Sequence, residues 1–195
     1  MPVTTPNSGP SGSLLARIAA LSIFVVFIQT GVVSEVPVLG VRVDLSPLVV
    51  VFVGYLCGAT LGAMAGFAVG LLVDLALVQT LGVSSLIFTV IGYGAGRLRE
   101  LRDPHGALVP LLLGAGAAGF SMIGYSLIEF MLGVDAPVSW DLLRQIVLGV
   151  LVDVIVAVPF WAIVRRVLEP SLPDDPRRRR RRAYTTGGLS PLSRA

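Results

Sequence analysis

The sequence is poor in charge, has one cysteine and one histidine, and contains no lysine. Charged residues make up 14% of the 195-residue chain, against about 25% in typical soluble domains. All 15 basic residues are arginine, which we interpret as codon usage rather than chemistry. Cys57 has no partner for an intrachain disulfide, and with His105 alone the chain lacks the residues for a Cys/His metal cluster. We therefore expect no disulfide framework, no metal and no cofactor.

The sequence is rich in apolar residues. Hydrophobic residues account for 54% of the chain before glycine is counted, and the mean hydropathy is +0.85. A soluble domain of this length would have to expose many of these residues to water, which leads to aggregation. The composition therefore predicts an all-α, polytopic integral membrane protein.

Long apolar runs predict six membrane spans. The stretch 45–73 has no charged residue and continues apolar beyond Asp74 to Leu81. A single helix of that length would measure over about 50 Å, whereas the hydrocarbon layer is about 30 Å thick. We therefore predict two helices with a turn between Gly58 and Gly62, and one long tilted helix remains the alternative. The other predicted spans are 14–33, 83–96, 107–133 and 142–164.

The two ends of the chain differ from the predicted membrane domain, 14–168. Residues 1–13 are uncharged and rich in Pro, Ser, Gly and Thr, and residues 169–195 are rich in Pro and Arg. Neither composition can bury enough apolar surface to fold, so we predict two disordered tails. We expect the arginines of the second tail to lie on anionic lipid, and these are Arg177, Arg178, Arg179, Arg180, Arg181 and Arg182.

The arginines also predict the orientation, because positive charge is retained on the cytoplasmic side. With six spans, one face carries most of them: Arg97, Arg99, Arg102, Arg165, Arg166 and the tail cluster. The opposite links carry Arg42 and Arg144 among acidic residues. Both termini of this multi-pass membrane protein are therefore predicted to be cytoplasmic. Nucleic acid is not an expected partner.

Glycine recurs at every fourth position in the second and third spans. The series is Gly54, Gly58, Gly62, Gly66 and Gly70. In membrane helices, small residues at this spacing let two backbones approach closely, and van der Waals packing then holds the helices together. The pattern predicts a helix-packing face, and internal packing is favoured over contact with a partner protein.

Two carboxylates lie deep in apolar sequence, Asp74 and Asp153, each in a G-x-x-V-D pattern. An ionised group there costs roughly 2.5 to 3.5 kcal/mol on insertion scales, so it is usually functional or paired inside the bundle. The repeated pattern suggests an inverted internal repeat. An intramembrane aspartic peptidase and a proton or ion relay are alternatives. Neither aspartate has the Y-D or G-x-G-D context of presenilin-like enzymes, so we favour a structural role.

Several of these positions resemble the central pattern of the rod shape-determining protein MreD family. The resemblance covers about residues 14–168 and is carried by Gly66-Phe67, Gly70, Asp74, Thr80-Leu81-Gly82 and Leu86, with Asp44 and Leu45 opening the preceding span. Gln29, Tyr93 and Pro159 also lie where the family tends to place them. The Arg-rich tail and Asp153 depart from the pattern as we know it.

The resemblance implies a non-enzymatic scaffold of the bacterial inner membrane, which belongs to the cell-elongation machinery and supports cell shape and lateral peptidoglycan synthesis. Its implied partners are MreC, MreB, RodA and penicillin-binding protein 2. The family is also similar in layout to the substrate-binding subunits of energy-coupling-factor transporters, so a vitamin-binding subunit is the alternative function. The candidate packing or partner-interface residues are Gly54, Gly58, Gly62, Gly66, Gly70, Asp74, Gly82 and Asp153.

Overall fold

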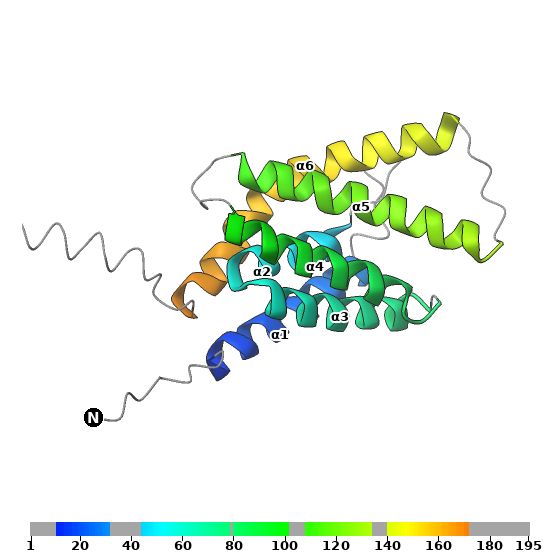
Figure 1. Ribbon diagram of the computed structural model, residues 1–195. Coiled ribbons are helices and arrows are strands. Elements are labelled where there is room, and N and C mark those ends of the chain that lie inside the picture. The colour runs from blue at the N-terminus through cyan, green and yellow to red at the C-terminus, as the bar shows by residue number, and fades with distance from the viewer. Residues whose placement is uncertain (1–10, 32–43, 79, 102–107, 134–139, 172–195) are drawn as a thin grey trace, which may run out of the picture.

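The computed structural model describes residues 11–31, 44–78, 80–101, 108–133 and 140–171, and all regular secondary structure in these ranges is helical. The all-α prediction is therefore confirmed for the described residues. Six α-helices are followed by a short 3-10 turn, η2 (Figure 1). Their bounds are α1 Gly12–Gly31, α2 Leu45–Cys57, α3 Ala59–Ala76, α4 Val83–Leu101, α5 Val109–Met131, α6 Trp140–Leu168 and η2 Glu169–Ser171.

Four of these helices, α1, α3, α5 and α6, are long and apolar enough to cross a bilayer. Helix α2 is apolar but has only 13 residues, which corresponds to a length of about 20 Å. Helix α4 has 19 residues, and Arg97 and Arg99 lie in its second half. The predicted six spans are thus six helices, of which four meet the length and composition of a span on their own.

The break between α2 and α3 lies at Gly58, within the turn predicted from chain length. Gly58 has a φ of +101°, which a residue with a Cβ rarely adopts. One residue therefore suffices to end α2 at Cys57 and to begin α3 at Ala59. The alternative of one long tilted helix is wrong.

Helix α2 is the centre of the bundle and contacts each of the five other helices. Its side chains from Leu48 to Val53 are almost completely buried, and the ring of Phe52 packs edge-on against Trp161 of α6 at 5.0 Å between centroids. Because the neighbouring helices cover α2, it does not need the length of a lipid-facing span.

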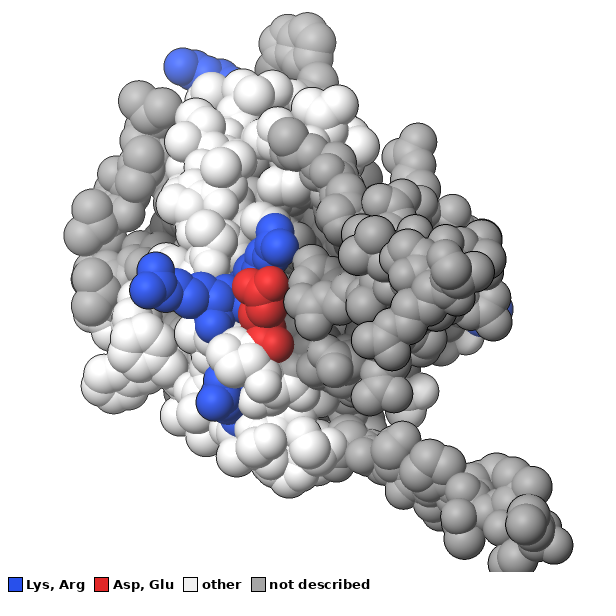
Figure 2. Space-filling view, turned by 90° about the vertical axis from the view of Figure 1, so that its left-hand side faces the viewer, with Lys and Arg blue, Asp and Glu red and all other residues white. Residues whose placement is uncertain are grey.

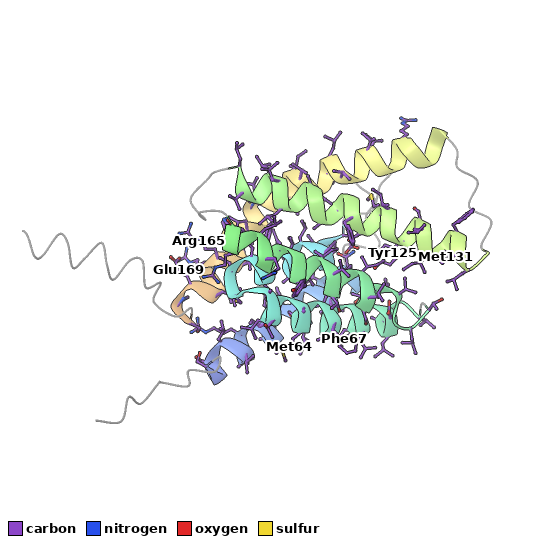
Figure 3. All side chains as sticks on the ribbon, in the orientation of Figure 1. Met64, Phe67, Tyr125, Met131, Arg165 and Glu169 are labelled. Atoms are coloured by element: carbon purple, nitrogen blue, oxygen red, sulfur yellow. The ribbon has the colours of Figure 1, made fainter. Side chains whose placement is uncertain are left out.

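The outer surface is apolar. Met64 and Phe67 point away from the bundle on α3 (Figure 3), and they are 61% and 57% exposed. Met131 at the end of α5 is 78% exposed. A soluble protein rarely exposes so many large apolar side chains, and in this chain they form the surface that faces lipid.

Successive helices run in opposite directions, so α1 begins at the end of the bundle where α2, α4 and α6 finish (Figure 1). We call this the arginine end. Arg17 of α1 donates a hydrogen bond to the carbonyl of Val167 (2.9 Å), and Arg99 of α4 donates one to the carbonyl of Leu56. Arg165 and Glu169 form an exposed ion pair at 3.6 Å. Figure 2 shows basic side chains gathered on this end around an acidic group.

Candidate functional site

The described glycines of the four-residue series do not all have the same surroundings. A Cβ added to Gly62, Gly66 or Gly70 of α3 would overlap backbone atoms of α4, and one added to Gly54 of α2 would overlap the carbonyl of Gly92. We call these four glycines and their α4 contacts the glycine seam. Gly58 is different, because nothing lies within 4 Å of a Cβ placed there. Its role is the left-handed turn between α2 and α3.

Helix α4 completes the glycine seam from its own side. A Cβ on Gly92 would overlap the carbonyl of Gly62, and one on Gly96 would overlap the backbone of Ala59. Gly94, which lies between them in sequence, has open space around it. The seam therefore joins α3 and α4 backbone to backbone, and larger side chains would force the two helices apart.

Asp74 binds the start of α4 at one end of the seam. Its side chain is fully buried. One carboxylate oxygen accepts a hydrogen bond from the backbone amide of Gly82 (2.7 Å), and the other accepts one from that of Ser84 (3.3 Å). The first amides of a helix have no partner within the helix, and negative charge is stabilised there. Asp74 thus fixes the turn between α3 and α4, at which Gly82 has a φ of +96°.

A small polar cluster extends from this turn toward α5. The hydroxyl of Tyr125 hydrogen-bonds to Ser84 Oγ (2.7 Å), and its ring packs edge-on against Phe88 at 6.4 Å between centroids. Ser85 Oγ donates to the carbonyl of Phe67 (3.3 Å). These contacts connect α5, α4 and α3 through groups that would be costly to leave unpaired in a bilayer.

Asp153 binds the start of α2 in a comparable way. It is 1% exposed, and its Oδ1 accepts a hydrogen bond from the amide of Asp44 (3.2 Å). Gln29 of α1 accepts one from the amide of Leu45 (3.0 Å), and the Asp44 side chain accepts one from the amide of Ser46 (3.0 Å). Side chains from α1, α6 and the chain before α2 thus satisfy the amides of the N-cap residue and of the first two residues of the central helix.

The two aspartates therefore hold the starts of two different helices, α4 and α2. Both oxygens of Asp74 are engaged by backbone donors, whereas Asp153 Oδ2 has no hydrogen-bond partner among the described residues. A peptidase dyad needs two carboxyls that share a proton. The observed arrangement is that of two helix caps, and it supplies the buried partners that the sequence led us to expect for these charges.

Other predicted residues fall outside the described part of the chain. The arginine cluster Arg177 to Arg182 lies there, as do most of the two tails, so their roles stay predictions. The described edges differ slightly from the predicted bounds. Helix α1 begins at Gly12, and residues 169–171, which we assigned to the second tail, form η2.

The sequence interpretation did not single out Ser46, Ser84 or Tyr125 as site residues. A serine or tyrosine in an apolar run is common and gives no signal of its own. For the start of α2 a local signal was available, because Asp44 followed by Pro47 is typical of a helix N-terminus. That signal predicts the cap, but it does not reveal that Gln29 and Asp153 meet there.

Comparison with known proteins gives one match. The family described as rod shape-determining protein MreD matches residues 12–169. This range begins at the first residue of α1 and ends one residue beyond α6. No curated protein and no solved structure matches the chain.

Proposed function

Because the chain belongs to the MreD family of rod shape-determining proteins, we propose that it is a multi-pass scaffold of the cell-elongation machinery in the bacterial inner membrane. The single observation that carries this proposal is the extent of the match. Residues 12–169 include all six helices, the glycine seam and both aspartate caps. The whole bundle is therefore the unit that the family shares.

The architecture supports a structural rather than a catalytic role. Asp74 and Asp153, two fully buried carboxylates of the described helices, bind backbone amides at the starts of α4 and α2. The glycine seam and these caps give a close-packed bundle whose outer surface is apolar. Such a bundle presents rigid helix faces in the membrane, on which other membrane helices can pack by shape.

The orientation that we propose has the arginine end in the cytoplasm. Arg17, Arg99, Arg165 and Arg166 lie there, whereas Arg144 is near the start of α6 at the other end. Arginine excess close to helix ends is the main determinant of topology. Both termini then face the cytoplasm, where MreB is the proposed partner. MreC, RodA and penicillin-binding protein 2 are the proposed partners within and beyond the membrane.

Co-purification tests the scaffold proposal. The tagged chain is extracted from native membranes in mild detergent, and bound proteins are identified by mass spectrometry. We expect MreC and at least one of RodA and penicillin-binding protein 2 to be recovered above an untagged control. The Gly116→Ala chain should recover the same proteins as the wild-type chain, because nothing lies within 4 Å of a Cβ at Gly116. Recovery of none of these proteins with the wild-type chain would contradict the proposal.

The similarity in layout to vitamin-transporter subunits stays a prediction. A subunit of that kind would bind a vitamin saturably and would need a neighbouring ATPase pair for uptake. Purified wild-type protein that binds no vitamin in a direct binding assay would remove this alternative.

A further inference from the structure

A cleft of about 470 Å³ opens at the end of the bundle opposite the arginine end. The polar residues of its lining are Gln29, Asp44, Ser46, Thr80 and Tyr125, which come from α1, the start of α2, the α3–α4 turn and α5. Cavities that hold small molecules have volumes of about 300 to 1,000 Å³ and combine an apolar lining with a few convergent polar groups. The cleft therefore has the size and composition of a small-molecule site.

The other lining residues of the cleft are apolar. Val73 and Leu77 contribute from α3 and its C-terminus, Val83 from α4, and Ile128 and Leu132 from α5 and its C-terminus. Apolar side chains of this kind gain free energy when an apolar group replaces water beside them. The lining thus combines polar and apolar side chains, and a ligand that matches both needs a polar head and an apolar body.

Two buried oxygen atoms beside Asp44 lack hydrogen bonds. Ser46 lines the cleft and is fully buried, yet its Oγ makes no hydrogen bond within the described residues. The Oδ2 atom of Asp153, whose Oδ1 accepts from the Asp44 amide, is also buried and unpartnered in the described structure. An unsatisfied buried polar group costs about 1 to 3 kcal/mol. A ligand in the cleft that donates a hydrogen bond to Ser46 Oγ would recover that free energy.

The charge of the cleft indicates which hydrogen-bond donor a ligand would carry. Asp44 is the one carboxylate among the described lining residues, and none of them is basic. Burial raises the pKa of Asp44, against the backbone amide of Ser46, which donates a hydrogen bond to the carboxylate and lowers it. A cation next to the carboxylate would compensate for the lost hydration. Of the cationic groups, a primary ammonium has three donors on one compact atom, which suits the Asp44 carboxylate and Ser46 Oγ, two acceptors from neighbouring residues of the cleft lining.

We propose that the cleft binds a primary ammonium group carried on an apolar body. The ammonium lies against the Asp44 carboxylate and Ser46 Oγ, and the apolar body lies along Val73, Val83 and Ile128. The ammonium can belong to a free amine or to the headgroup of phosphatidylethanolamine. The site opens on the membrane face opposite the arginine end, so the ligand enters from that side.

The test uses the full chain in nanodiscs of phosphatidylcholine, which has no primary amine. The probe is 2-phenylethylamine, and its neutral isostere 2-phenylethanol is the control. Binding is measured by saturation-transfer NMR, with empty nanodiscs as the background. We expect saturable binding of the amine and at least tenfold weaker binding of the alcohol. Absence of saturable amine binding, or equal binding of the two probes, would overturn the proposal.

Two variants locate the site. Asp44→Asn removes the charge but keeps an oxygen that can cap α2, and we expect at least a tenfold loss of amine affinity. Ser46→Ala removes the buried hydroxyl, and Ser121→Ala is its matched control, because Ser121 is also a buried serine with an unpartnered hydroxyl but does not line the cleft. We expect Ser46→Ala alone to weaken binding. Amine binding that both Asp44→Asn and Ser46→Ala leave unchanged would show that the amine binds elsewhere.

The source of the ammonium is distinguished by a second lipid composition. If the phosphatidylethanolamine headgroup occupies the cleft, nanodiscs that contain this lipid should raise the apparent Kd of 2-phenylethylamine by competition. If the Kd is the same in both lipids, the natural ligand is a free amine. Folding of each variant is checked by its size-exclusion profile, so that loss of binding is read only from folded protein.

Discussion

The carboxylate of Asp74, near the end of α3, is 2.7 Å from the backbone amide of Gly82, which precedes α4. This hydrogen bond closes the turn between the two helices that share the glycine seam. It also explains why a carboxylate is present in an otherwise apolar span, because the first amides of α4 would have no partner in the bilayer without it.

We predict that Asp74→Ala destabilises the bundle. The substitution leaves the part-buried amide of Gly82 and the buried amide of Ser84 without their acceptor, and the expected loss is about 1 to 3 kcal/mol in the free energy of unfolding. Asp74→Asn retains one acceptor oxygen and should lose less. The measurement is SDS-induced unfolding in mixed micelles. If Asp74→Ala unfolds at the same SDS fraction as wild type, the cap contributes nothing to stability.

The glycine seam gives a second prediction. A Cβ at Gly66 would overlap the carbonyl of Phe88, so Gly66→Ala should force α3 and α4 apart at a cost of about 1 to 3 kcal/mol. Gly66→Leu should prevent assembly of the bundle. Gly94→Ala is the matched control, because its Cβ would meet nothing within 4 Å. Thermal unfolding in detergent distinguishes the two alanine variants. Equal melting temperatures for Gly66→Ala and Gly94→Ala would contradict the close backbone contact of α3 and α4 in the glycine seam.

The start of α2 makes stability depend on pH. Burial raises the pKa of Asp44 above its usual value of 3.8, so between 3.8 and the raised pKa the unfolded chain releases a proton that the folded protein keeps. Unfolding is then favoured as pH rises through this window. We expect the wild-type unfolding free energy to fall across it by more than that of Asp44→Asn. Parallel pH profiles would contradict the prediction.

Orientation can be tested with single cysteines. Cys57 is the one cysteine of the chain, so Cys57→Ser gives a background for Arg166→Cys at the arginine end and Leu132→Cys at the other. A membrane-impermeant maleimide applied to spheroplasts should label the Leu132→Cys chain. The Arg166→Cys chain should react only after the membrane is opened. The reverse pattern would place the arginine end outside.

Much of the helix layout could be predicted from sequence, because span length has a physical limit. The break near Gly58 followed from the length of the apolar stretch 45–81. The central position of α2 could not be predicted, since side chains that face lipid and side chains that face protein are both apolar, and periodicity therefore carries little information. The structure also shows why 13 residues suffice for α2, because the other five helices cover it.

The partners of the two buried aspartates could also be predicted only in part from the sequence. Apolar surroundings predicted that Asp74 and Asp153 need partners. For Asp74 the partners are eight and ten residues away, within reach of a turn that Gly82 allows. For Asp153 the partner is the amide of Asp44, which is 109 residues away. No local pattern encodes that contact, since it depends on how α6 packs beside α2.

The central claim is that this bundle supports rod shape, and cell shape on depletion of the chain tests it most directly. The gene that encodes this chain is placed under a repressible promoter in its host, and cell length and width are measured after repression. Depleted cells should become wide and round, and wild-type chain or Gly94→Ala should restore the rod, whereas Gly66→Leu should not. Cells that keep their rod dimensions without the chain would contradict the account.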